Sequence, residues 1–341
     1  MRIAIVAVAV LAALPLVAQQ YDETITVVRY LLQVRVTDHG GRAITDLTAD
    51  DFTVQIGGKV AHVESANFVG GAQPTKRWPT LAEIEVGVAP APAERAGRHI
   101  VVLMQTDFGR NESRIKGQLK FNGVADQIVR LLEPSDRVAV LSHDSYLKLR
   151  LDFTEDRDAA REAIRRSIRI DKPPPVAVSK GISITHHLNP AAMKNAYSAE
   201  EAMLLVAIAL HSIEGRRVII LGGWGMGEKR GSNVMLGPEW RQAVDILRED
   251  RVPVIVLHTG MQGGQLSLPL MKTAQETGGF FAGTQDFAQQ AVNRVEGTLQ
   301  GHYELSLRVD DGLKAGEHAL NIRVNRKSAR VLAPASVVNS R

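Results

Sequence analysis

The chain has 341 residues, of which 45% are hydrophobic and 23% charged, so it has the composition of an ordinary globular protein with room for about two domains. It contains no Cys, which excludes disulfides, thiolate metal sites and a lipid-modified Cys at a processing site. The net charge of +4 is spread along the chain, and the densest basic run, Arg161–Arg169, carries an interleaved Glu162. We therefore expect no nucleic-acid partner.

The first 18 residues have the pattern of a secretory signal peptide. Arg2 supplies a positive charge, residues 3–17 are almost wholly apolar, and Ala18 before Gln19 is a small residue suited to cleavage. The alternative is a membrane anchor, but the apolar run is shorter than the roughly 20 residues that a spanning helix needs. The pattern predicts an exported protein, periplasmic or extracellular, with no membrane span after cleavage of residues 1–18.

Residues 20–69 are expected to form a β unit. Ile25–Val36 is rich in β-branched residues and runs into a Gly-containing turn at 38–41. Two further strands, Phe52–Ile56 and Val60–Phe68, flank a Gly-Gly turn and carry apolar residues at alternate positions. Residues 70–97 contain four prolines among Gly and Ala, which predicts a linker.

Strand and helix patterns alternate from residue 98 to residue 299. Buried strands are expected at His99–Met104, Arg137–Ser142, Arg216–Leu221 and Val252–Leu257. Amphipathic helices are expected near Ile115–Leu132, Asp156–Ile168, Ala199–Ile213 and Glu239–Glu249. Ser198 and Glu201 have the spacing of a capping box before the third helix. This alternation predicts an α/β fold with a doubly wound, mainly parallel sheet.

Residues 300–333 return to a β pattern. The expected strands are His302–Val309, His318–Val324 and Ala329–Ala333. An all-β start and an all-β finish around an α/β centre suggest that both ends form one small β-sandwich, into which the central domain is inserted. Two separate β units are the alternative.

The central sequence resembles the von Willebrand factor A domain. The resemblance is carried by LLEPSDRVAVLS (Leu131–Ser142) and LDFTEDRDAAREAI (Leu151–Ile164). Together with Val34–Val63, it is most similar to the von Willebrand A-related domain of secreted acidobacterial proteins, over residues 20–333. The resemblance implies a Rossmann-like fold and a role in binding a protein partner.

The resemblance also implies a metal-ion-dependent adhesion site. In that family an Asp-x-Ser-x-Ser loop, a distant Thr and a later Asp hold a divalent cation through oxygen ligands. Asp107 matches the first ligand, whereas Gly109 and Asn111 replace the two Ser residues. Gly222 and Gly223 stand where the later Asp would lie.

Two more residues weaken the expected site. Ser198 is the single substitute for the Thr, and Arg110 brings a positive charge into the loop. The degenerate motif predicts that no metal or other cofactor is bound. The alternative is Mg²⁺ or another divalent cation at Asp107, Asn111 and Glu112.

A binding rim is expected where the strands of the central sheet end, because open α/β sheets bind their ligands at this edge. His143 and Asp144 follow the second strand there, and Phe108, Trp224 and Met226 are large apolar residues on segments expected to be exposed, which suits them to anchor a protein partner. The candidate rim residues are Asp107, Phe108, Asn111, Glu112, His143, Asp144, Trp224 and Met226.

These patterns favour a secreted, non-enzymatic protein-interaction module with no catalytic residues. The alternative from another class is a metal-dependent or hydrolytic enzyme that uses Asp107, His143 and Asp144 at the rim. Ser142 to Asp144 place three catalytic residue types in a row, but a triad needs them to converge from different elements. A purely structural envelope protein is the third reading.

Overall fold

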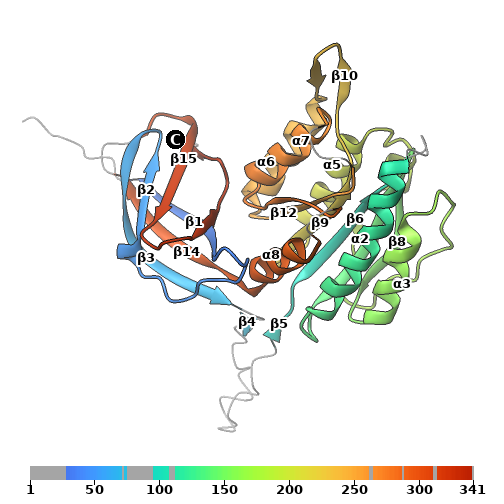
Figure 1. Cartoon of the computed structure of the whole chain (residues 1–341), viewed down its shortest axis with the longest axis horizontal. Coiled ribbons are helices and arrows are strands. Elements are labelled where there is room, and N and C mark those ends of the chain that lie inside the picture. The colour runs from blue at the N-terminus through green and yellow to red at the C-terminus, as the bar shows by residue number, and fades with distance from the viewer. Residues whose placement is uncertain are drawn as a thin grey trace, which may run out of the picture.

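The computed structural model describes residues 28–70, 73–74, 95–106, 112–260, 264–285, 288–309 and 313–339. These residues form a β unit and an α/β unit that lie side by side (Figure 1). The predicted signal peptide lies outside the described residues, as does most of the predicted linker, of which β4 (Gln73–Pro74) pairs with β5 (Arg95–Ala96). In the described part of the chain, no helix is long and apolar enough to cross a membrane.

Strands from both ends of the chain build one seven-stranded antiparallel sheet, in the order β16-β1-β14-β3-β2-β15-β17. The strands are β1 (Val28–Thr37), β2 (Phe52–Ile56), β3 (Lys59–Gly70), β14 (Gly301–Val309), β15 (Gly316–Val324), β16 (Arg330–Leu332) and β17 (Ser336–Asn339), with a 3-10 turn at Ala49–Asp51. β14 pairs with β1 on one side and with β3 on the other, and Val34 lies opposite Tyr303.

The β unit has a single core. Alternate residues of β1 and β14, such as Val34 and Tyr303, are buried in it together with Phe52 and Val54 of β2. β1 and β2 are separated by two strands in the sheet but share this core, so the sheet curls around its own interior. The structure therefore differs from the expected two-sheet sandwich, because hydrogen bonding continues from strand to strand across the whole sheet.

The α/β unit is built on a six-stranded sheet in the order β13-β12-β9-β6-β7-β8. Its strands are β6 (His99–Gln105), β7 (Arg137–His143), β8 (Leu147–Thr154), β9 (Arg217–Gly223), β12 (Val254–His258) and β13 (Phe281–Gly283). Counted along the chain, this order is 3-2-1-4-5-6 from the β8 side, which is the order of a doubly wound sheet. The α/β expectation is thereby confirmed.

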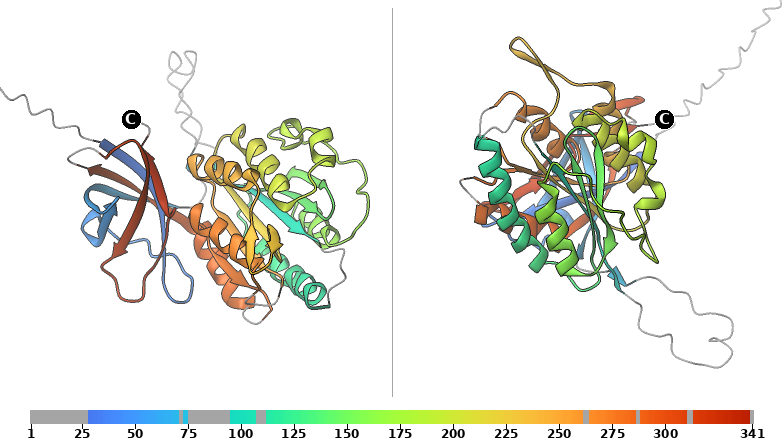
Figure 2. Two further views of the ribbon diagram at one scale, coloured as in Figure 1. Left: turned by 90° about the horizontal axis from the view of Figure 1, so that it is seen from above. Right: turned by 90° about the vertical axis from the view of Figure 1, so that its right-hand side faces the viewer.

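Helices cover both faces of this sheet (Figure 2). Ile100 and Val102 of β6 pack with α2 (Glu112–Arg130), α3 (Arg157–Ser167) and α8 (Ala288–Gln300). Val101 and Leu103 face the opposite side, which is covered by α5 (Ala199–His211), α6 (Pro238–Glu249) and α7 (Ser267–Glu276). Because every β6 residue is buried, its sequence reads as a continuous apolar run. The shorter α4 (Pro190–Lys194) and the 3-10 turn Thr185–His187 precede α5.

The prediction of a mainly parallel sheet is confirmed in part. β12, β9, β6 and β7 are parallel and β13 joins them in the same sense, but β8 runs antiparallel to β7 at the edge. Three residues connect β7 to β8, and so short a connection permits only an antiparallel pair. Hydrophobic periodicity in the sequence also did not predict β13, α7, α8 or the hairpin of β10 (Glu228–Arg230) and β11 (Asn233–Met235).

The two units meet tightly where α8 runs into β14. Gly297 of α8 lies against Gly41 in the turn after β1, where an added Cβ would come within 1.8 Å of the Gly41 carbonyl oxygen. Gly41 itself has a φ of +87° and lies against the backbone of Arg294. Only residues without a Cβ permit this approach of the helix to the turn.

Candidate functional site

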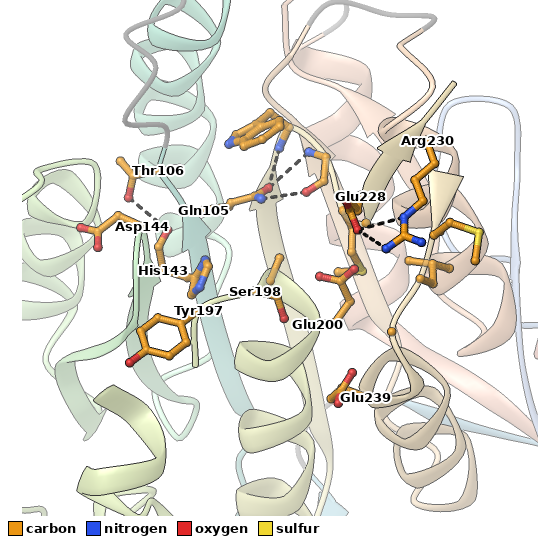
Figure 3. Close-up of a pocket in the computed structure, with 18 residues that line it drawn as sticks. Gln105, Thr106, His143, Asp144, Tyr197, Ser198, Glu200, Glu228, Arg230 and Glu239 are labelled. Carbon is orange, nitrogen blue, oxygen red and sulfur yellow. Dashed lines mark hydrogen bonds and ion pairs between the residues drawn. The ribbon is translucent and has the colours of Figure 1, made fainter. Parts of the chain in front are cut away.

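A pocket of about 560 Å³ opens at the carboxyl edge of the six-stranded sheet, where β6, β7 and β9 end (Figure 3). β6 leads to α2 on one face of the sheet, whereas the chain after β9 leads to α6 on the other. The edge is therefore the topological switch point at which doubly wound sheets bind ligands. We call it the carboxyl-edge pocket; its lining includes Gln105, Thr106, Tyr197, Glu200, Arg230 and Met235.

Gln105 at the end of β6 holds the glycine-rich loop that follows β9. Its side-chain Nε2 donates to the Gly225 carbonyl at 2.7 Å, and its Oε1 accepts from the Trp224 and Gly225 amides at 3.0 and 3.3 Å. Gly222 permits close packing here, since an added Cβ would meet the Phe121 ring at 2.7 Å. These glycines and Gln105 shape one wall of the pocket.

Trp224 is half buried and is not a free anchor. The Arg114 guanidinium lies 3.5 Å from the centroid of its ring, a cation–π contact between α2 and the loop. The Trp224 carbonyl is 3.2 Å from Nε2 of His258, and burial lowers the pKa of that histidine. The loop is thus joined to β6, α2 and β12.

The prediction that Met226 is exposed at the rim is wrong. It is only 3% exposed and belongs to the core on the α5, α6 and α7 face, although its edge still lines the pocket. The residue that follows, Gly227, has a φ of +88°, which turns the chain outward into the β10–β11 hairpin. Met226 therefore closes the core below the hairpin and offers almost no surface to a partner.

Glu200 contributes a buried carboxyl group at the base of the pocket. It is 5% exposed and lies at the start of α5, with its carboxyl group directed into the pocket (Figure 3). Burial raises its pKa, and hydrogen bonds from its own backbone amide and that of Gly227 oppose the shift. A partially desolvated carboxyl group favours a ligand that donates hydrogen bonds or carries positive charge.

The outer wall carries exposed side chains. Tyr197 is 71% exposed and Met235 is 52% exposed. Arg230 pairs with Glu228 along the hairpin at 3.1 Å. The hairpin stands out from the body of the α/β unit beside the pocket (Figure 1). Large exposed side chains around a pocket are the arrangement that protein interfaces use as anchors.

Ser142, His143 and Asp144 do not converge on one point. The Ser142 hydroxyl accepts from Nε of Arg150 at 2.7 Å, and the buried His143 ring places Nε2 3.1 Å from the Ala196 carbonyl. Asp144 is buried in an ion pair with Lys148.

The pKa directions agree with these separate roles. Burial lowers the pKa of His143, against the opposing effect of its bond to Ala196, so the ring is neutral and Nε2 donates. Burial raises the pKa of Asp144, but Lys148 and the Ser145 amide together hold it below its usual value. The three residues are structural in this arrangement and form no triad.

Three of the expected rim residues, Asp107, Phe108 and Asn111, lie outside the described residues. Glu112 is exposed at the start of α2 and pairs with Lys116 at 2.6 Å. His143 and Asp144 line the pocket, but the His143 ring is hydrogen-bonded to the Ala196 carbonyl and the Asp144 carboxylate is paired with Lys148. Of the eight expected rim residues, His143, Asp144, Trp224 and Met226 line the pocket.

Three described oxygen-bearing side chains at this edge make hydrogen bonds within the protein. The Thr106 hydroxyl is 3.3 Å from the His143 carbonyl, and Gln105 is bonded to the loop. Ser198, the expected substitute for the family's Thr, accepts from the Glu201 amide at 3.1 Å, which confirms the predicted capping box. Among the described residues, no group of three or more His, Asp or Glu side chains is arranged around a common point.

No protein-family model matches the chain, and no curated protein matches it. Solved structures resemble it at low identity. The conserved hypothetical protein BatB from Bacteroides thetaiotaomicron is 16% identical, with a TM-score of 0.36 over 59% of this chain and 98% of BatB.

Two further structures show similar scores. A von Willebrand factor type A structure from Catenulispora acidiphila is 9% identical, with a TM-score of 0.40 over 92% of this chain and 74% of that one. The manganese-loaded TRAP protein of Plasmodium vivax is 11% identical, with a TM-score of 0.40 over 70% and 92%. The assignment to the doubly wound class rests on the strand order of this chain.

Sequence reasoning missed the residues that give the pocket its chemistry: Gln105, Tyr197, Glu200, Arg230, Met235 and Glu239. Gln105 directly follows the predicted strand His99–Met104, so its position at the carboxyl edge was a usable signal. Glu200 looked like an ordinary first-turn acid of a capped helix. The β10–β11 hairpin, which local periodicity did not indicate, lines the same pocket as Glu200.

Proposed function

We propose that this chain is an exported, non-enzymatic protein-interaction module of the von Willebrand A-like type, with a degenerate metal-ion-dependent adhesion site. The partner binds at the carboxyl-edge pocket without a bridging cation. Export is supported by the charged, apolar and small-residue pattern of residues 1–18. The von Willebrand A relationship is supported by the 3-2-1-4-5-6 strand order with an antiparallel edge strand.

The observation that carries the proposal is the composition of the pocket. A concave site at the switch point combines a buried carboxyl group, Glu200, with two exposed anchors, Tyr197 and Met235. Protein interfaces pair large side chains with a desolvated centre in this way. Glu239 adds a second carboxyl group to the lining, so the proposed partner inserts a segment bearing Lys or Arg beside apolar residues.

The proposal that the partner binds without a cation is supported by the hydrogen bonds that polar side chains at the carboxyl edge make within the protein. Gln105, Thr106 and Ser198 use their side chains to position the glycine loop, β7 and α5. Arg114 places a guanidinium over Trp224 beside the same edge. A divalent ion would have to displace these bonds before it gained oxygen ligands.

Site-directed photo-crosslinking tests this proposal. A photoreactive phenylalanine derivative replaces Tyr197, and in a matched control it replaces Val60, which is 70% exposed on β3 of the β unit. After irradiation in cell-envelope extract of the source organism, we expect a discrete adduct from position 197 and none from position 60. The same adduct is expected in the presence of a chelator, and it should disappear when Met235→Ser is added.

Two outcomes contradict the proposal. Identical adducts from positions 197 and 60, or none from position 197, would remove the pocket as the interaction site. Loss of the adduct on chelation would instead restore a cation-dependent adhesion site.

A further inference from the structure

A second pocket lies at the opposite, amino edge of the six-stranded sheet, between the two units. It has a volume of about 210 Å³, and five of its lining residues are arginines: Arg35, Arg98, Arg216, Arg217 and Arg251. Among the described lining residues, Asp250 carries the one carboxyl group. We call this site the arginine pocket.

Strand alternation explains how the β unit supplies its part of the arginine pocket. Val34 of β1 and Tyr303 of β14 point into the β core and are directly paired. Their neighbours Arg35 and His302 therefore lie on the outer face of the same two strands, which faces the α/β unit. From the α/β unit, Arg98 precedes β6 and Arg216 precedes β9.

Two of these side chains are buried without satisfying their hydrogen-bonding groups. Arg35 is 6% exposed, and its Nε has no hydrogen-bond partner among the described residues. His302 is 2% exposed, and neither ring nitrogen has a hydrogen-bond partner there; the nearest carboxylate oxygen, of Glu304, is 3.8 Å from Nε2. Buried polar groups in folded proteins are normally paired, so these atoms indicate a missing acceptor.

The pKa values of these groups reflect the concentration of positive charge. Burial, and then the Coulombic effect of Arg216, lower the pKa of Arg35 to about 10. Burial together with Arg35, Arg216 and Arg251 lowers the pKa of His302 to about 3. An anion in the pocket would reverse the Coulombic part of both shifts.

Not every arginine in the pocket is available to a ligand. Arg98 is held by Asp136 in a buried ion pair and donates to the Leu299 carbonyl. Arg217 donates to the Leu210 carbonyl at 2.7 Å and lies 3.7 Å from Asp250. These two residues build the floor of the pocket, and Arg216 also has an interaction within the protein. Arg35 and Arg251 remain as the side chains that can turn to a ligand.

Arg251 adds an independent indication, because its backbone is unfavourable for an arginine. It follows the C-cap of α6 with a φ of +57°, in a left-handed position that glycine usually occupies. Its amide donates to the Arg248 carbonyl at 3.1 Å, a bond that glycine would make equally well. The side chain, exposed at the mouth of the pocket, is what distinguishes arginine from glycine here.

We infer that the arginine pocket binds a phosphate group, free or as a phosphomonoester, between the β unit and the α/β unit. Guanidinium groups match the oxygens of phosphate in geometry and charge, and a dianion compensates more of the buried positive charge than a carboxylate does. His302 would complete the site as a neutral donor. Because its ligands come from both units, the bound phosphate would hold the units together.

Thermal unfolding with inorganic phosphate as the probe tests this inference. Sodium chloride keeps the ionic strength constant, and acetate serves as the carboxylate comparison. We expect phosphate at about 10 mM to raise Tm by several degrees, and chloride and acetate to leave it unchanged, because a ligand that binds only the native state stabilises it. A phosphomonoester that shifts Tm at lower concentration would identify the esterified form as the ligand.

Variants locate the effect. Arg35→Gln should weaken the phosphate affinity measured by calorimetry about tenfold or more, since it removes a charged donor. Arg251→Gly should raise Tm without phosphate, because it relieves the left-handed backbone, and should still weaken phosphate binding. Ser328→Gly is the matched control: Ser328 also has a positive φ, of +68°, in the turn before β16, so its variant should raise Tm and keep the full phosphate response.

Three results would overturn the inference. Phosphate that stabilises no more than chloride would show that the pocket binds no such ion. An equal effect of acetate would replace phosphate by a carboxylate ligand. A full phosphate response in both Arg35→Gln and Arg251→Gly would place the binding elsewhere. Because Arg251→Gly is expected to fold better than the parent, a loss of phosphate binding in this variant cannot be attributed to misfolding.

Discussion

The two edges of the six-stranded sheet carry opposite chemistry. At the carboxyl edge, a pocket of about 560 Å³ is lined by Asp144, Glu200, Glu228 and Glu239, and Arg230 is the one arginine among its described lining residues. At the amino edge, a pocket of about 210 Å³ is lined by five arginines and a single Asp. The same buried strands thus present an acidic site at one end and a basic site at the other.

The construction of the two sites differs as well. The carboxyl-edge pocket is formed within the α/β unit, by loops that follow strands and by a projecting hairpin. The arginine pocket exists only because the β unit covers the amino edge with Arg35 and His302. Strand-end loops suffice to build the first site, whereas the second depends on the docking of two units. Loss of docking should therefore affect the amino edge alone.

The largest effect is expected from the ion pair that supports the amino edge. Asp136 accepts from the Arg98 amide at 2.9 Å and from its Nε at 2.8 Å, and both side chains are almost completely buried. Asp136→Asn leaves the buried guanidinium with the partly exposed carboxylate of Glu133, 3.8 Å away, as its remaining counter-charge, which should lower the free energy of unfolding by about 3 kcal/mol in urea titrations.

Asp126→Asn is the control for that loss. Asp126 is one-fifth exposed and pairs with Arg165 at 2.9 Å on the surface of α2 and α3. Its variant should cost less than about 1 kcal/mol. Equal losses in the two variants would show that the amino-edge pair is no more important than a surface pair.

A pH dependence should also arise at the amino edge. Burial lowers the pKa of His99 to about 4 and that of His302 to about 3, from an ordinary value near 6.5. Below pH 6.5 the unfolded chain binds protons at both positions while the native chain does not. Stability is therefore greatest above pH 6.5 and falls as the pH drops toward 4, by about 1.4 kcal/mol per pH unit for each histidine.

Urea titrations at pH 7.5, 6 and 5 measure this slope. His302→Gln should reduce the measured slope by about 1.4 kcal/mol per pH unit, and the same substitution at His39, which is exposed in the turn after β1, should not. A slope that His302→Gln leaves unchanged would mean that other groups dominate acid unfolding.

At the carboxyl edge, Gln105 should have an intermediate effect. Gln105→Leu removes one donated and two accepted hydrogen bonds to the glycine loop and leaves the Trp224 and Gly225 amides without their acceptor. We expect a loss of about 1–3 kcal/mol in urea titrations and a weaker photo-crosslink at position 197. A stable variant with an undiminished crosslink would show that the loop needs no support from β6.

The smallest effect on stability is expected at Glu200, where a substitution should weaken partner binding without lowering the free energy of unfolding. Burial raises the pKa of this carboxyl group, so its charged form is less stable in the native state than in the unfolded chain. Glu200→Gln should raise the free energy of unfolding by less than about 1 kcal/mol while it weakens the crosslink at position 197. A variant that binds its partner as well as the parent would remove Glu200 from the interface.

Local pattern predicted many elements of the α/β unit. β6 and β7 lie at the continuous apolar runs that were expected, and α5 begins at the Ser198 capping box. β8 shows where this reasoning fell short: Leu147–Thr154 alternates and follows β7 after three residues, which is a hairpin signal. The alternation of strands and helices elsewhere in the unit predicts parallel pairing and does not indicate this antiparallel edge strand.

The candidate site was less accessible from sequence. The position of the carboxyl edge follows from the alternation of strands and helices, and it directed attention to His143 and Asp144. Whether a side chain at this edge can contact a ligand depends on its contacts within the protein. Asp144 forms an ion pair with Lys148, and Met226 packs in the core. Lys148 lies only four residues from Asp144 but meets it across the β7–β8 turn, and the core around Met226 is built by several elements, so periodicity indicates neither contact.

The sequence by itself therefore determined many of the elements, the α/β character of residues 98–299 and the edge at which a site should lie, because burial imposes a local period on strands and helices. Tertiary structure alone decided which residues meet. The pairing of β1 with β14 brings Arg35 beside His302, and docking at Gly41 and Gly297 places both against the arginines that precede β6 and β9. Long-range strand pairing and close backbone contact leave no local signal in the chain, so the arginine pocket became visible only in three dimensions.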